Sequence, residues 1–65
     1  MTPEDKFDLV RLLLERGAEV QTFYRRRRVV AVEKADSRIV VRYGDGGTDK
    51  MRLRDFARRR FVAVV

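Results

Sequence analysis

The spacing of apolar residues changes at Gly17, and this change constrains the fold more than any other feature. Before Gly17, Phe7, Val10 and Leu14 recur at the spacing of one helical face. After it, apolar and polar residues alternate in short runs, as they do in β-strands. We therefore expect an amphipathic helix over residues 2–17, followed by a β-structure over residues 18–65.

Both ends of the expected helix carry signals. Thr2 can serve as the N-cap, Pro3 suits the first helical position, and Gly17 can end the helix in a left-handed conformation. Leu9 and Leu12 widen the apolar stripe to more than half of the helix circumference. One sheet face would struggle to cover so wide a stripe. Leu9 and Leu12 are therefore a candidate face for a homodimer, with ordinary core packing as the alternative.

Five runs of alternating or β-branched residues are predicted as strands: 18–24, 28–34, 37–43, 50–54 and 61–65. Residues 35–37 and the glycine-rich residues 44–47 are typical of hairpin turns. Residues 55–58 are too short for a stable helix and are predicted as a single turn. The expected fold class is α+β, mainly β, with one helix followed by a five-stranded antiparallel barrel.

A chain of 65 residues fits a single domain, 1–65, and buries only about 60% of the surface that its unfolded form exposes. Cysteine and histidine are both absent, so neither disulfides nor the usual zinc ligands can stabilise it. Asp45 and Asp49 flank a glycine turn but supply too few oxygen ligands for a calcium loop. We expect no metal and no cofactor. No signal peptide or membrane span is evident, and the expected location is the cytoplasm.

The charge of the chain is unevenly distributed. Residues 1–24 hold five acids and three bases, a net charge of −2, whereas residues 25–65 hold thirteen bases and five acids, a net charge of +8. Thirteen of the sixteen bases are arginine, whose guanidinium group suits bidentate phosphate contacts and stacking on bases. A GC-rich genome, in which a protein uses arginine wherever any basic residue would do, would explain this preference for arginine equally well, but it does not explain the net charge. The distribution favours an anionic partner.

Three basic clusters are candidate binding sites. The primary one is the run Arg25, Arg26, Arg27 and Arg28 between two expected strands. The supporting residues are Lys50 and six arginines: Arg42, Arg52, Arg54, Arg58, Arg59 and Arg60. Tyr24 and Tyr43 are candidate stacking platforms for bases. The alternative for each cluster is a solvated surface that only keeps the protein soluble.

Five short strands with a helical turn before the last one resemble the small Src-homology-3-like barrel. The likeness is carried by the strands from "AEVQTFY" to "KMRLR", by "DF" and by "FVAVV"; "VVRYGDG" followed by "MRLRDF" is its most familiar part. It covers residues 18–65, and the helix is an addition. Tudor, chromo-barrel and KOW modules share this plan and bind nucleic acids or peptides. The glycine and basic pattern of KOW modules is absent, and a Tudor-like aromatic cage would need Tyr24, Tyr43 and Phe56.

We do not expect an enzyme, because the chain has no histidine or cysteine, and its one serine, Ser37, has no evident companion base. The expected function is a non-catalytic binding module that contacts DNA or RNA mainly through phosphates. The alternative is a small phage or mobile-element protein, such as an antirepressor or an anti-defence inhibitor. It would bind an acidic surface of a host protein.

Overall fold

The computed structural model describes residues 1–64, which form two helices and five strands. In chain order these are α1 (Pro3–Glu15), β1 (Glu19–Thr22), β2 (Arg28–Ala35), β3 (Arg38–Tyr43), β4 (Thr48–Arg52), α2 (Leu53–Arg58) and β5 (Phe61–Val64). The strands form one antiparallel sheet in the order β4-β3-β2-β1-β5. The predicted α+β class, with an N-terminal helix before five antiparallel strands, is confirmed.

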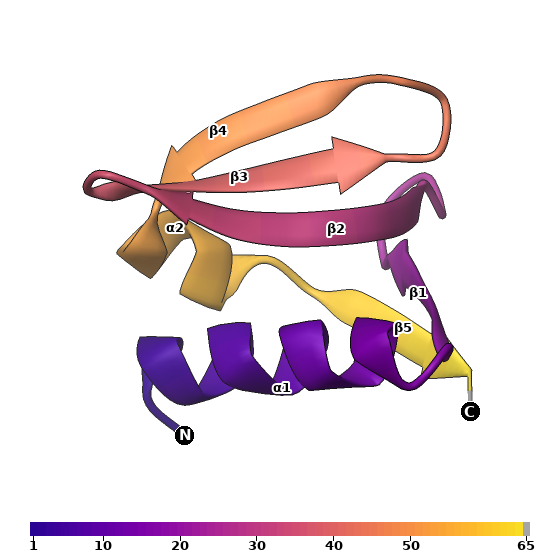
Figure 1. The fold of residues 1–65 in the computed structure, drawn as a ribbon, viewed down its shortest axis with the longest axis horizontal. Helices are drawn as coiled ribbons and strands as arrows, with labels where there is room; N and C mark the ends of the chain where they lie inside the picture. The colour runs from indigo at the N-terminus through magenta and orange to yellow at the C-terminus, as the bar shows by residue number, and fades with distance from the viewer. Residues whose placement is uncertain (65) are drawn as a thin grey trace.

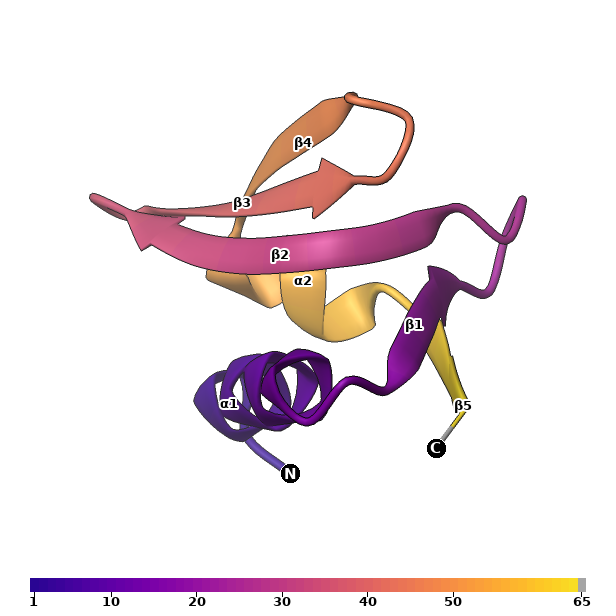
Figure 2. The same cartoon turned by 45° about the vertical axis from the view of Figure 1, so that its right-hand side comes forward.

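The two helices lie on the same side of the curved sheet. In Figure 1, β2, β3 and β4 form the upper layer and α1 runs below them, while the 45° turn in Figure 2 shows α1 nearly end-on. α2 contacts α1, β3 and β4, so it lies between the first helix and the sheet edge at β4. β5 crosses beneath and pairs with β1 at the other edge.

The ends of α1 are formed as the sequence predicts. The Thr2 hydroxyl accepts a hydrogen bond from the Asp5 N–H at 3.1 Å, and the Asp5 carboxylate accepts one from the Thr2 N–H at 3.3 Å. This reciprocal pair is a capping box. At the other end Gly17 has a φ of +80°, and the Ala18 N–H donates to the Leu13 carbonyl at 3.0 Å, which closes the helix.

α2 corrects the prediction for residues 50–58. The expected strand 50–54 ends at Arg52, and Leu53 and Arg54 already belong to the helix. An isolated helix of this length is not stable in water, so local sequence gives little signal for it. Tertiary packing stabilises it instead, because Phe56 is fully buried and Leu53 packs against the core.

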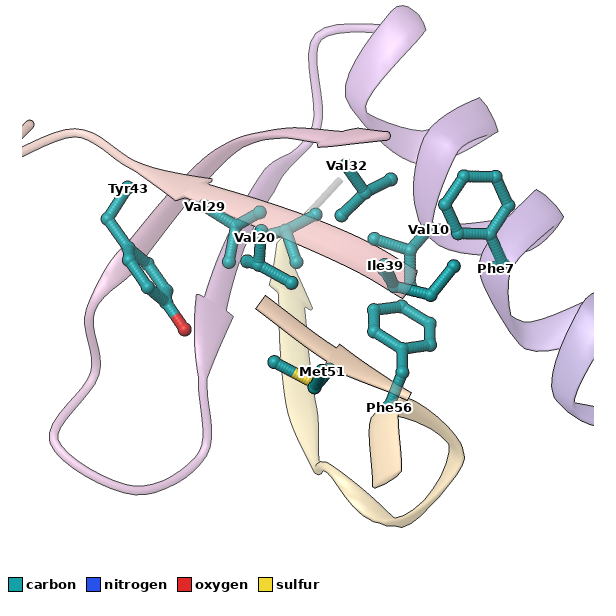
Figure 3. Close-up of a cluster of buried hydrophobic side chains, with 10 residues drawn as sticks. Phe7, Val10, Val20, Val29, Val32, Ile39, Tyr43, Met51 and Phe56 are labelled. Carbon is teal, nitrogen blue, oxygen red and sulfur yellow. The ribbon is translucent and has the colours of Figure 1, made fainter. Parts of the chain in front are cut away.

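The core lies between the sheet and the two helices. Ten buried apolar residues form it: Phe7, Val10, Val20, Val29, Val32, Ile39, Val41, Tyr43, Met51 and Phe56. Figure 3 shows Phe7 and Phe56 at one end of this cluster and Tyr43 at the other. A register shift in the β2–β3 pair between Val29 and Ala31 lets Val29 and Val32 both point inward.

We predict that Phe56→Ala lowers the free energy of unfolding by about 3–5 kcal/mol, because it empties the space between Phe7 and Phe61. Phe56→Leu keeps most of the volume, so its loss should be clearly smaller. Val30→Ala, at a side chain that is 46% exposed, serves as the control and should change little. Urea unfolding followed by circular dichroism measures all three, and equal losses for Phe56→Ala and Val30→Ala would contradict the packing described.

Candidate functional site

The loop between β1 and β2 carries most of the arginine run and is held by Thr22. The Thr22 N–H donates to the Arg27 carbonyl at 2.8 Å, and the Thr22 hydroxyl accepts from the Arg27 N–H at 2.9 Å and donates to the Tyr24 carbonyl at 2.7 Å. Arg25 and Arg26 adopt left-handed conformations with φ of 71° and 53°. The loop is therefore a defined turn, and its backbone projects beyond the paired ends of β1 and β2 (Figure 2).

A second segment, the link from α2 to β5, brings Arg59 and Arg60 close to this loop. Lys6 of α1 donates to the Ala57 carbonyl at 2.9 Å and to the Arg59 carbonyl, which ties the link to the first helix. Partial burial lowers the pKa of Lys6. The Phe23 N–H donates to the Arg60 carbonyl at 2.9 Å and joins the link to the end of β1.

These two segments enclose a cavity of about 260 Å³. We call it the arginine cavity. Four arginines and two tyrosines line it, Arg25, Arg27, Arg59, Arg60, Tyr24 and Tyr43, together with Thr22 and Asp49. Two of the three predicted basic clusters therefore meet in one place. This convergence depends on the pairing of β1 with both β2 and β5, which brings residues far apart in sequence together.

Tyr43 and Asp49 line the arginine cavity as a hydrogen-bonded pair. The Tyr43 hydroxyl donates to the Asp49 carboxylate at 2.6 Å, and the Arg59 guanidinium lies 3.7 Å from the same carboxylate. The pKa of Tyr43 is raised to about 12, mainly by desolvation and to a smaller extent by the hydrogen bond to Asp49 and the negative charge of Asp49. Tyr43 is therefore a neutral hydrogen-bond donor at physiological pH.

Arg27 is largely occupied by partners within the protein. Its guanidinium stacks over the Tyr43 ring, 3.8 Å from the centroid, and donates to the Asp45 carboxylate at 3.2 Å. The Gly47 N–H also donates to the Asp45 carboxylate, at 2.8 Å. The pKa of Asp45 is lowered mainly by this hydrogen bond and, to a smaller extent, by Arg27. The Asp45 side chain therefore stabilises the turn at residues 44–47.

Arg25 and Arg60 keep their charge available. In the part of the chain that the structure describes, no carboxylate lies within 4.0 Å of either guanidinium. Two exposed aromatic side chains lie beside them: Tyr24 is 78% exposed and Phe23 is 52% exposed. The Arg25 guanidinium is 5.7 Å from the Tyr24 centroid, and the Arg26 and Arg60 guanidinium groups are each 5.8 Å from the Phe23 centroid.

Not every predicted site residue reaches this cavity. Arg42, Lys50 and Arg52 lie on the outer face of β3 and β4, where Arg38 joins them, and we call these four residues the outer basic face. Their chain neighbours Asp49, Met51 and Tyr43 point inward, so this face is on the other side of the sheet from the arginine cavity. Arg42 pairs there with Glu33 at 3.3 Å.

The remaining predicted residues occupy other positions. Arg54 and Arg58 are exposed on α2 rather than on a sheet face, and Arg26 and Arg28 are exposed beside the cavity without lining it. Tyr43 is only 4% exposed and Arg27 covers its ring, so of the two predicted platforms only Tyr24 offers an open face. An aromatic cage does not form, because Phe56 is fully buried in the core.

Phe23 is the site residue that sequence reasoning missed. Alternation predicts it on the outer face of a strand 18–24, but β1 ends at Thr22 and Phe23 begins the loop. The signal that could have found it is a pair of consecutive aromatic residues directly before an arginine run, because strand ends of this kind present their side chains to solvent.

An apolar groove of about 490 Å³ lies next to the arginine cavity, between α1 and β5. Leu9, Leu13, Val20, Phe23 and Phe61 line it, with Lys6 and Arg60 as its charged members. Leu9 and Leu12 are 42% and 43% exposed, and only Leu9 reaches the groove. The homodimer suggested by these two leucines stays a prediction.

Among residues 1–64, no helix has the length and apolar character needed to cross a membrane, and no group of three or more acidic side chains could hold a metal ion. No family model, curated protein or solved structure matches the chain. The likeness to the Src-homology-3-like barrel therefore stays a prediction, as does the expected cytoplasmic location.

The raised pKa of Tyr43 predicts a loss of stability at high pH. Because the folded pKa is about 12 and the ordinary value is 10.0, the stabilisation is complete below about pH 10 and is lost as pH rises toward 12. Wild type should therefore lose more stability between pH 8 and pH 11 than Tyr43→Phe. Urea midpoints of both proteins at the two pH values measure this difference, and parallel losses would contradict it.

Proposed function

We propose that this protein is a non-catalytic module that binds nucleic acid mainly through phosphate contacts. The observation that carries the proposal is the meeting of Arg25 and Arg60, from segments far apart in sequence, at one cavity without carboxylate partners. Guanidinium groups without internal partners are suited to phosphate oxygens. The net charge of +6 adds a long-range attraction for a polyanion.

The ion pairs within the protein separate the four arginines of the cavity into two that have a structural role and two that are available for binding. Arg27 and Arg59 are already held by Asp45 and Asp49, so they shape the cavity. Arg25 and Arg60 gain a phosphate without losing an internal ion pair. Truncating them should therefore weaken binding without weakening the fold.

We predict that Arg25→Ala with Arg60→Ala lowers nucleic-acid affinity and reduces the slope of log affinity against log salt by about 2, one for each lost phosphate contact. Lys50→Ala with Arg52→Ala is the matched control, since it removes the same charge from the outer basic face. Fluorescence anisotropy with a labelled oligonucleotide at several salt concentrations measures both. Equal losses for the two double variants would mean that overall charge, not the cavity, determines binding.

A second candidate is a module that binds the acidic and apolar surface of another protein, including a host protein if this chain comes from a phage or mobile element. The apolar groove favours it, because Leu9 and Phe23 offer apolar contact while Arg60 adds a positive charge at the same place. An acidic partner segment with apolar side chains complements this combination.

This second candidate predicts a complex that survives nuclease treatment and requires the groove. A pull-down with and without nuclease compares wild type with Leu9→Glu and with Leu12→Glu, which is equally exposed but lies outside the groove. Loss of a stoichiometric partner only with Leu9→Glu would support protein binding. A complex that disappears with nuclease in every protein would contradict it, and sedimentation of the same three proteins tests the homodimer.

A further inference from the structure

We infer that the nucleic acid bound here is single-stranded, with successive bases stacked on Tyr24 and Phe23 and the linking phosphate at Arg60. The inference rests on the proposed function and names the class of nucleic acid for that same site. Four observations carry it: the exposure of the two rings, the hydrogen bonds within their loop, the presence of Arg60 beside both rings, and the small size of the arginine cavity.

The two rings are the aromatic side chains that the fold leaves most open to water. Phe7, Tyr43 and Phe56 are buried and Phe61 is half-buried against the core, whereas Phe23 and Tyr24 are 52% and 78% exposed. Adjacent exposed aromatic side chains leave a large apolar area in water, which proteins use at sites of interaction. A base has a flat aromatic face that covers such a ring whatever its sequence.

Hydrogen bonds order the backbone of the loop that carries both rings. Thr22 makes hydrogen bonds with both Arg27 and Tyr24, and Thr22 itself is only 9% exposed. Arg25 and Arg26 have left-handed backbone conformations, which residues with a side chain rarely adopt. A loop that is already ordered loses little conformational entropy on binding, so stacking can contribute fully to affinity.

Arg60 is near both platforms, and its guanidinium lies over the Phe23 ring, 5.8 Å from the centroid. It lines the arginine cavity together with Tyr24, and it lines the apolar groove together with Phe23. In a single strand, the phosphate between two neighbouring bases lies between their stacking partners. Arg60 is therefore placed to contact that phosphate, and Arg25 beside Tyr24 is placed to contact the next one.

A duplex does not fit this arrangement. Its base faces already stack on one another, so Tyr24 and Phe23 would meet only backbone and base edges unless a base were flipped out. The arginine cavity is also small, about 260 Å³, so a flexible strand can place a base or a phosphate in it, whereas a stiff double helix can only lie across its opening. A duplex would find a better match on the outer basic face.

The test compares three polyanions on the intact protein: a labelled oligothymidylate, a hairpin duplex of similar charge, and inorganic polyphosphate, which has no bases. Wild type should bind the single strand at least tenfold more tightly than the other two. Tyr24→Ala and Phe23→Ala should each lower single-strand affinity by about tenfold and leave duplex affinity unchanged. Tyr24→Phe and Phe23→Tyr should keep the single-strand affinity, because both retain a ring.

The outcomes separate this inference from the proposed function. If the single strand and the duplex bind equally, and the alanine variants lose nothing, the single-strand inference fails while phosphate binding stands. If polyphosphate binds as well as the oligonucleotide, base stacking is likewise excluded. If no nucleic acid binds, the proposed function fails and the inference fails with it. Urea midpoints of the variants show that they remain folded, which their exposed positions lead us to expect.

Discussion

The packing of Phe56 is the interaction on which the rest of the structure depends. Its ring is fully buried and lies 6.0 Å from the Phe7 ring of α1 and 5.4 Å from the Phe61 ring of β5. α2 is too short to persist without this contact. With Phe56 fixed, the link to β5 follows a set path, and Lys6 holds that path at two carbonyl groups. The position of Arg59 and Arg60 is therefore a consequence of core packing.

In the arginine cavity, arginines without a carboxylate partner lower the stability of the free protein but are available to bind an anion. Four guanidinium groups close together repel one another, and within the described residues the two acids that pair with them are Asp45 and Asp49. Asp45 pairs with Arg27, which also packs over the Tyr43 ring. Asp49 pairs with Arg59 and accepts the hydrogen bond from the Tyr43 hydroxyl. Arg25 and Arg60 remain without such compensation. Unbalanced charge of this kind costs some stability in the free protein and is relieved when an anion binds.

Local signals in the sequence predicted most of the fold, whereas contacts between distant segments could not be predicted from it. Thr2, Pro3 and Gly17 fix the ends of α1 through interactions with near neighbours. Tyr43 was predicted as a stacking platform but is buried, because its contacts with Arg27 and Asp49 depend on strand register and loop shape. The β1 strand ends two residues early because the turn at Arg25 and Arg26 begins there, and this exposes Phe23 and Tyr24.

Under the proposed function, the two basic surfaces would serve different steps of one encounter with a polyanion. The outer basic face and the arginine cavity lie on opposite sides of the sheet, so one short strand cannot contact both. Charge acts at a distance, however, and within about 8–10 Å at physiological salt both surfaces raise the local concentration of a polyanion. Under the proposed function, contact would then depend on shape and on an open ring beside unpaired guanidinium groups, which residues 1–64 combine at the arginine cavity in Tyr24, Arg25 and Arg60. The outer basic face would thus govern how fast a strand arrives, and the cavity how long it stays.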